Sequence, residues 1–189
     1  MAAFVNTFFE KRVNQLFDLA RRVDAAFSAV GVEYRVVGGL AAYLYVEEVS
    51  PDAGRLTKDI DIVVRREDLP RIADAVKKFG LEHRHAAGVD MLVQSNQPSA
   101  RRAVRMVFAG EKVREEYVEP VPQLGSGREI QQVPVIPLSD LVRMKLTSFR
   151  LKDQMHLKDL DQAGLVNPAI EESLSPSLRE RLARVREQE

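Results

Sequence analysis

Hydrophobic and polar residues follow two different periods along this chain. Between residues 5 and 30, apolar side chains recur every three or four positions, which predicts one long amphipathic helix ended by Gly31 in a left-handed conformation. Residues 34–37 then predict a strand, and Gly38–Gly39 leads from it into an apolar helix over residues 40–46. The chain therefore opens as helix, strand and helix.

The middle of the chain continues this alternation. Residues 59–64 and 103–108 have the apolar character of strands, and residues 67–79 predict a helix with acidic residues in its first turn, ended by Gly80. Residues 81–93 are less regular and contain a possible strand. Strands that alternate with helices predict a domain of the α/β or α+β class.

Four prolines and two glycines between residues 115 and 137 exclude a long helix there. We expect an extended connection with one short strand near residues 132–136. Apolar residues at helical spacing return over residues 140–149. These features predict a core over residues 1–137 and a C-terminal helical segment over residues 138–189 that packs on it.

Composition narrows the class of protein. The chain has 189 residues, 45% of them apolar, which is enough for one core, and its 28 basic residues balance its 28 acidic ones, so no global charge favours nucleic acid or a membrane. Cysteine is absent, which excludes disulfides and thiolate metal sites. No apolar run approaches membrane-spanning length, and the start lacks the order of a signal peptide, so we expect a cytoplasmic protein.

Candidate chemistry lies on the strand over residues 59–64, which carries two acidic side chains. Successive side chains leave a strand on opposite faces, so Asp59 and Asp61 share one face, roughly 6.6 Å apart along the strand, while Ile60 and Ile62 point into the core. Two like charges held together repel unless a cation lies between them, and carboxylate oxygens suit Mg²⁺. The pair therefore predicts a divalent metal site.

The Gly38–Gly39 step adds a second element to this site. Glycine lets the backbone take unusual dihedral angles and lets a ligand approach closely. The amide groups at the start of the following helix would then face phosphate oxygens. Phosphate binding beside metal-binding carboxylates is the combination that phosphoryl or nucleotidyl transfer requires.

Two ordered motifs carry a family resemblance. Val-Gly-Gly at residues 37–39, followed by Thr-Lys-Asp-Ile-Asp at residues 57–61, resembles the signature of the DNA polymerase β-type nucleotidyltransferase superfamily. The Thr-Lys-Asp-Ile-Asp form is most similar to the small bacterial branch that includes AbiEii-type and minimal (MNT-like) nucleotidyltransferases. Asp-Leu-x-x-x-Lys-Leu, then Arg and Lys-Asp, within residues 140–153 resembles a helix common in that branch. The resemblance extends over roughly residues 30–165 and implies a mixed sheet flanked by helices, with a C-terminal helical part.

The resemblance also implies roles for individual residues. Asp59 and Asp61 would be catalytic and would bind Mg²⁺ as the cofactor. The implied nucleotide-binding residues are Gly38, Gly39, Thr57, Lys58, Lys145 and Arg150. Lys145 and Arg150 have another interpretation, as part of a solvated helix face on which Arg150 pairs with Asp153.

One residue that the superfamily pattern leads us to expect is missing. In the superfamily, the strand beside the acidic pair often carries a third carboxylate, which helps to hold the metals or acts as a base. Residues 103–108 carry none. Asp90 or Glu111 could substitute as a metal ligand, or Arg105 could instead neutralise the two aspartates. A two-metal site without a third acidic ligand loses part of its cage, so an inactive relative is the alternative.

Three further polar features have ordinary structural interpretations. His83 and His85, with Asp90, could bind a transition metal, but the spacing is not diagnostic and favours surface or core histidines. We expect His156 to form a structural hydrogen bond with Asp159. Arg55, in the polar loop before the acidic strand, fits a substrate contact and a solvated connector equally.

The residues support two hypotheses about function. The first is a Mg²⁺-dependent enzyme that transfers a nucleoside monophosphate from an NTP to an acceptor hydroxyl of an RNA, a protein or a small molecule, with no membrane involved. The second is a catalytically inactive protein of the same fold that binds a protein partner, as in a toxin–antitoxin pair. If Arg105 bridges the aspartates and fills the metal position, the second hypothesis is favoured. If Asp90 or Glu111 faces the aspartates across an open cleft, the first hypothesis is favoured.

Overall fold

Seven strands join in one mixed sheet within the part of the chain that the structure, a computed structural model, describes: residues 2–51, 53–55, 57, 59–99 and 102–187. Side chains of the first helix are described from Gln15 onward. The strands are β1 (Arg35–Val37), β2 (Ile60–Val64), β3 (Leu81–Ala86), β4 (Val89–Gln94), β5 (Val104–Phe108), β6 (Arg128–Ile130) and β7 (Val133–Val135). Their order across the sheet is β3-β4-β5-β2-β1-β7-β6.

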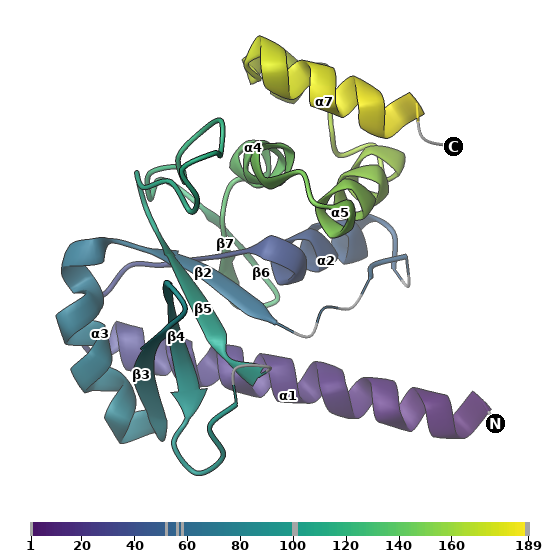
Figure 1. Ribbon diagram of the computed structural model, residues 1–189. Helices are drawn as coiled ribbons and strands as arrows, with labels where there is room; N and C mark the ends of the chain where they lie inside the picture. The colour runs from purple at the N-terminus through teal and green to yellow at the C-terminus, as the bar shows by residue number, and fades with distance from the viewer. Residues whose placement is uncertain (1, 52, 56, 58, 100–101, 188–189) are drawn as a thin grey trace.

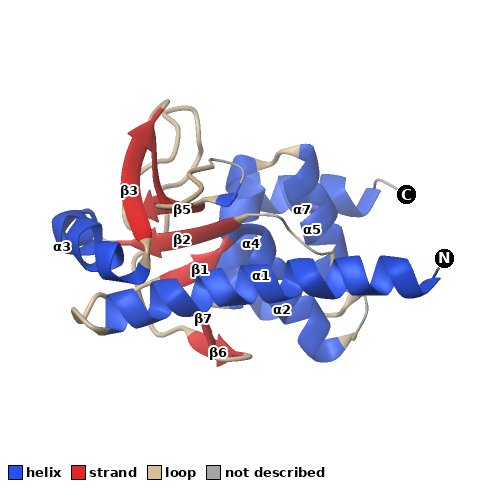
Figure 2. Cartoon of the chain, turned by 90° about the horizontal axis from the view of Figure 1, so that it is seen from below, coloured by secondary structure: helices blue, strands red, loops and turns tan. Residues whose placement is uncertain are grey.

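Helices lie on both sides of this sheet. In Figure 1, α1 (Ala2–Ser28) runs below the sheet, while α4 (Leu138–Ser148), α5 (Leu151–Gln162) and α7 (Pro176–Glu187) lie together above it. The view from below in Figure 2 accordingly has α1 in front. The other elements are α2 (Gly38–Val49), α3 (Leu69–Ala75), α6 (Pro168–Ser173) and the 3₁₀ turns η1 (Arg66–Asp68) and η2 (Val76–Phe79). None of the described helices has the length and apolarity needed to cross a membrane.

The predicted fold class, a mixed sheet flanked by helices, is confirmed. The long N-terminal helix is present, and Gly31 and Gly80 have φ values of +63° and +66°, as left-handed helix ends require. The next helix starts at Gly38 rather than at residue 40, so the glycines form its first turn. The sequence did not predict β6, because three residues are too few to show a strand period.

The register of the strands determines what stands beside the acidic pair. β1 runs antiparallel to β2 and pairs Val37 with Asp61. β5 runs parallel to β2 along its other edge and pairs Asp61 with Arg105. Residues paired across neighbouring strands point to the same face. Arg105 therefore projects beside Asp61, and Gly38, the residue after Val37, begins its helix next to the same side chain.

Apolar side chains hold β2 from its opposite face. Ile60 and Ile62 are buried and belong to one continuous core that also includes Phe27 of α1. The Phe27 ring packs edge to face against Tyr34, with ring centroids 5.1 Å apart. Burying a large apolar side chain stabilises a fold by about 1.5–3 kcal/mol. This packing fixes which way β2 faces and so directs Asp61 away from the core.

The C-terminal helices are tied together by one arginine. Arg181 of α7 donates from Nη1 to the carbonyl oxygens of Leu146, at 2.7 Å, and Thr147, at 2.8 Å, at the end of α4. Its guanidinium also lies over the Phe149 ring, 5.3 Å from the centroid. The last carbonyls of a helix lack intrahelical partners, and positive charge beside them is favourable. The predicted boundary at residue 137 falls just before α4 and stays a prediction.

The variant Arg181→Ala should lower the free energy of unfolding by about 1.5–3 kcal/mol, because hydrogen bonds from a charged donor are lost. Arg184→Ala on the same helix is the control. Arg184 forms an exposed ion pair with Glu180, and its removal should cost about 0.5 kcal/mol or less. Urea unfolding followed by circular dichroism measures both variants. Equal stabilities would contradict a structural role for Arg181.

Candidate active site

Two glycines bring the start of α2 against the acidic strand. Gly38 has a φ of +70°, and a Cβ atom there would collide with Oδ2 of Asp61. A Cβ atom on Gly39 would lie 2.8 Å from Oγ1 of Thr57. Both positions therefore require the absence of a side chain. The first turn of α2 consequently lies directly beside Asp61 and Thr57.

The two aspartates face one cation. Asp59 directly precedes β2 and Asp61 lies within it. Nη1 of Arg105 is 3.0 Å from Oδ2 of Asp59 and 3.7 Å from Oδ1 of Asp61. The two acids therefore share one side of the strand, as the alternation predicts. Their side chains are 26% and 24% exposed, so both remain open to the space beside them.

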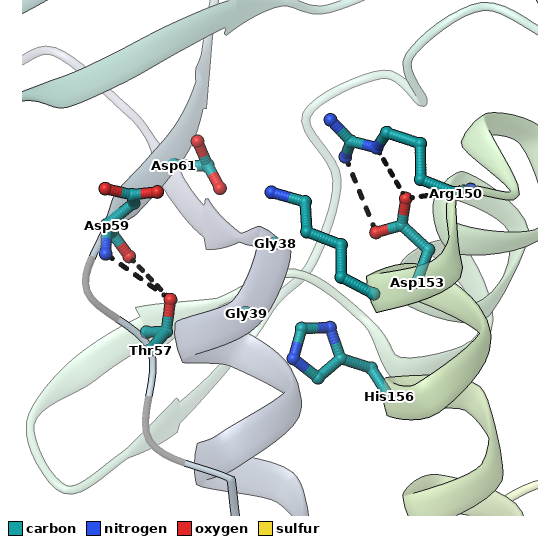
Figure 3. A pocket seen from close by; sticks show the side chains of 9 residues that line it. Gly38, Gly39, Thr57, Asp59, Asp61, Arg150, Asp153 and His156 are labelled. Atoms are coloured by element: carbon teal, nitrogen blue, oxygen red, sulfur yellow. Dashed lines mark hydrogen bonds and ion pairs between the residues drawn. The ribbon is translucent and has the colours of Figure 1, made fainter. Parts of the chain in front are cut away.

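A small cavity collects residues of both sequence motifs. It is lined by Gly38, Gly39, Thr57, Asp59, Asp61, Arg150, Lys152, Asp153 and His156. Figure 3 shows the two aspartates on one side of this space and Arg150, Asp153 and His156 on the other. Asp61 and Arg150 also line a larger cavity of about 650 Å³, together with Lys145 and Arg105. Lys58 lies outside the described residues.

Lys145 is buried, where the sequence pattern suggested a polar helix face. Its Nζ lies 3.0 Å from Nδ1 of His156 and 3.7 Å from Oδ1 of Asp153. Burial lowers the pKa of Lys145 to about 8, although the carboxylates of Asp153 and Asp61 counteract that shift. Burial, with the charge of Lys145, lowers the pKa of His156 to about 4. At neutral pH the imidazole is therefore uncharged and accepts a hydrogen bond from the Lys145 ammonium at Nδ1, which places its own proton on Nε2.

Arg150 fits both of its sequence interpretations. It lines the cavity, and its Nε also donates to Oδ2 of Asp153 at 2.7 Å. Asp153 is buried and accepts a further hydrogen bond from Ser148 at 2.8 Å. Burial raises the pKa of Asp153, but the hydrogen bond from Arg150 and the charge of Lys145 outweigh it, so the net pKa lies below its ordinary value. Asp153 thus stays ionised between the two cations.

Asp61 is less well compensated than Asp153. Burial raises its pKa, and Arg105, Lys152 and Lys145 only partly oppose that shift. Within the described residues its carboxylate accepts no hydrogen bond, and its ion pair with Arg105 is a long one. The site therefore presents a carboxylate that still favours additional positive charge.

Asp90 and Glu111 line the larger cavity together with Asp61, but both are paired with other side chains. Oδ1 of Asp90 lies 2.7 Å from Nε2 of His83 and 3.2 Å from Nδ1 of His85. Glu111 accepts two hydrogen bonds from Arg66, both 2.6 Å long. In the described part of the chain, no group of three or more histidine, aspartate or glutamate side chains could hold a metal ion. The described residues thus give neither a third acidic ligand nor a histidine metal site.

The register explains why Asp90 is unsuited to that role. Asp90 is paired with Met106, and Met106 points to the face of β5 opposite Arg105. Arg105 lies on β5 directly across from Asp61. The strand on which the resemblance led us to expect a third carboxylate therefore presents an arginine to Asp61.

The predicted hydrogen bond between His156 and Asp159 is wrong. His156 contacts Lys145 instead, while Oδ2 of Asp159 accepts a hydrogen bond from Nε of Arg55 at 2.7 Å. A helix brings residues three apart to one face, but here each of the two side chains bonds to a residue outside α5: His156 to Lys145 of α4, and Asp159 to Arg55 of the loop before β2. The Arg55 contact connects that loop to α5.

Sequence reasoning missed Lys152, Asp153 and His156 as cavity residues. A signal was available, because positions three and four apart on a helix share one face. Lys152, Asp153 and His156 have that spacing at the start of α5. The motif led us to single out only Lys145 and Arg150, and the packing of α5 against α2 is needed to place these three residues at the cavity.

Comparison with solved structures places the fold among nucleotidyltransferases. A crystal structure of ANT(2″)-Ia in complex with adenylyl-2″-tobramycin aligns with a TM-score of 0.57 at 15% identity, covering 93% of this chain and 98% of that chain. An antigenic nucleotidyltransferase-like protein from Paracoccidioides brasiliensis gives 0.55 at 14% identity, with 92% and 88% covered. The solution structure of the antibiotic-resistance factor ANT(2″)-Ia gives 0.50 at 14% identity, with 92% and 83% covered.

No protein-family model and no curated protein sequence matches this chain. At such low identities the likeness to solved structures establishes the fold. The nucleotidyltransferase-like fold that the two motifs predicted is therefore confirmed by three-dimensional structure.

The variant Gly38→Ala should destabilise the protein more than Gly31→Ala. Both glycines have left-handed φ values, +70° and +63°, so each alanine costs about 1–2 kcal/mol in backbone strain. No atom lies within 4 Å of the new Cβ at Gly31, whereas at Gly38 it meets the Asp61 carboxylate. We expect an additional loss of at least about 1 kcal/mol for Gly38→Ala. Urea unfolding measures the difference, and equal losses would refute close approach at Gly38.

Stability should depend on pH through Lys145. Its pKa is lowered from 10.5 to about 8, so between these values the folded state binds fewer protons than the unfolded state. The contribution of this position is therefore least favourable below pH 8 and improves as the pH rises. Relative to Lys145→Met, the wild type should gain about 2 kcal/mol between pH 8 and pH 10. Urea unfolding across this range tests the shift, and a constant difference would contradict it.

Proposed function

We propose that this protein is a Mg²⁺-dependent nucleotidyltransferase that moves a nucleoside monophosphate from an NTP to an acceptor hydroxyl. One observation carries the proposal: segments far apart in the sequence line a single cavity that combines the acidic pair, a glycine-led helix start and the cations Arg150 and Lys152. The shared fold supports the same conclusion. The motifs at residues 57–61 and 140–153 favour the AbiEii-type or MNT-like branch.

The acidic pair fits one Mg²⁺ ion bound together with nucleotide phosphates. Mg²⁺ usually takes one or two protein carboxylates and completes its shell with phosphate oxygens and water. Asp59 and Asp61 supply such oxygens, and Asp61 is the carboxylate that burial leaves undercompensated. When bound, the ion would polarise the α-phosphate and lower the cost of negative charge in the transition state. The described residues offer no third acid for a two-metal cage.

The remaining residues would bind the triphosphate. The amides of the first turn of α2, at Gly38 and Gly39, would donate to phosphate oxygens, which also gain from the positive end of the helix. Lys145, charged below pH 8 and held by His156 and Asp153, would offset phosphate charge. Lys58 and Thr57 keep the nucleotide-binding role that the motif implies.

The reaction is a substitution at phosphorus. The acceptor oxygen forms a bond to the α-phosphorus, the bond from that phosphorus to the bridging oxygen breaks, and pyrophosphate leaves. The hydroxyl proton passes to solvent. We assign to the acceptor the part of the larger cavity of about 650 Å³ that the triphosphate leaves open beside Asp61. One relative of this fold was crystallised with adenylyl-2″-tobramycin; RNA and protein acceptors would use the same chemistry.

A second candidate function is nucleotide or partner binding without transfer. The contact of Arg105 with both aspartates favours it, because a guanidinium already offsets part of the negative charge of the pair. The open cavity beside the pair favours the enzyme, because Asp61 and Arg105 both line it. If a nucleotide binds without Mg²⁺ and no pyrophosphate is released, the protein binds nucleotide without transferring it.

The variant Asp61→Asn tests the proposal. Calorimetry with ATP, GTP, CTP and UTP in Mg²⁺ should detect metal-dependent binding of at least one of them, and Asp61→Asn should weaken it about tenfold or more. Asp74→Asn, an exposed aspartate of α3 paired with Lys77, is the matched control and should bind normally. The absence of metal-dependent binding for all four nucleotides would defeat the proposal.

A further inference from the structure

Arg105 holds the position that a metal ion would need. Its Nη1 contacts both carboxylates of the pair, at 3.0 Å from Asp59 and 3.7 Å from Asp61. The register of β2 and β5 fixes this placement, because Arg105 is the residue paired with Asp61. Two carboxylates and one guanidinium leave one net negative charge. A divalent ion can therefore bind both acids only if Nη1 moves away.

The Arg105 side chain is only partly restrained by its contacts. Its side chain is 33% exposed, and of its nitrogens only Nη1 has a hydrogen-bond acceptor among the described residues. A guanidinium carries five donors in a planar fork that matches phosphate oxygens. Arg105 also lines the larger cavity, together with Lys145. Its remaining donors therefore lie at a cavity that has room for a phosphate group.

The local charges disfavour binding of a free metal ion. Mg²⁺ alone would add two positive charges beside Arg105, close to the cations Lys145 and Lys152 that already act on Asp61. The displaced guanidinium would lose its acidic partners, because the other acids that line this cavity already pair with other side chains: Asp90, Glu111, Glu119 and Asp153. A metal-bound triphosphate removes both difficulties, because its phosphate oxygens offset the added charge and accept the hydrogen bonds that Arg105 gives up.

We infer that Arg105 is a positioning residue that excludes free divalent metal from Asp59 and Asp61 and moves to the triphosphate when metal and nucleotide arrive together. The inference rests on the proposed function, since it assumes that the acidic pair binds a metal. A third carboxylate on β5 would help to bind the metal, whereas Arg105 on β5 competes with it. The guanidinium leaves the two aspartates when the metal of the nucleotide complex binds them.

The first test measures binding of free Mn²⁺, as a probe for Mg²⁺, by electron paramagnetic resonance without nucleotide. Arg105→Met removes the charge and keeps the length of the side chain, and should bind Mn²⁺ about tenfold tighter than the wild type. Arg105→Lys keeps a positive charge, and its Mn²⁺ affinity should lie between those of the wild type and Arg105→Met. Arg21→Met, which removes an exposed arginine paired with Asp18, is the control and should match the wild type. Equal affinity in wild type and Arg105→Met would overturn the inference.

The second test observes the wild-type protein and uses a variant only to assign one resonance. The Nε–Hε resonance of Arg105 in the wild-type protein, assigned with Arg105→Lys, should shift when Mg²⁺ and a non-hydrolysable NTP analogue are added together. Mg²⁺ alone should leave it unchanged, and a shift with Mg²⁺ alone would overturn the inference.

The two proposals fail in different ways. If Arg105→Met gains Mn²⁺ affinity while no nucleotide binds to either protein, the exclusion of free metal by Arg105 stands, but its transfer to the triphosphate and the proposed function are both lost. If nucleotide binds with Mg²⁺ and the Arg105 resonance does not respond, the proposed function stands and the inference is lost.

Discussion

Two carboxylates held side by side at the start of the central strand of the sheet must be offset by positive charge, and much of this structure serves that constraint. The strand that carries Asp61 is fixed by apolar packing on its other face, so the carboxylate stays on the face opposite that core. Burial raises its pKa, which means that the charged form costs free energy. Positive charge reaches it from three elements: Arg105 on β5, Lys145 on α4 and Lys152 on α5.

The same constraint explains why the C-terminal helices carry a polar network in their interior. A buried lysine is costly unless it is paired and hydrogen-bonded. Lys145 has Asp153 and His156 as partners, and Asp153 is in turn held by Arg150 and Ser148. These contacts place a cation opposite the acidic pair. Arg181 of α7 then fixes the end of α4 from outside.

Several parts of this architecture could be predicted from the sequence because their causes are local. The three-to-four-residue period gave the long first helix, and Gly31 and Gly80 ended helices where only a left-handed residue fits well. The alternation of Asp59, Ile60, Asp61 and Ile62 placed both acids on one side of a buried strand. The predictions that failed involved competition between distant partners, as for His156, which lies against Lys145 instead of Asp159.

The sequence by itself determined that the two acids would share one side of a strand and that a glycine step would follow another strand, because strand alternation and backbone conformation depend only on neighbouring residues. Tertiary structure alone decided which charges meet them. Arg105 stands against Asp61 because β5 lies beside β2 in one particular register, and Lys145 is buried because α4 and α5 close over the cavity. Side-chain charges act through space, so their effect on a carboxylate depends on the fold that brings them within a few ångströms.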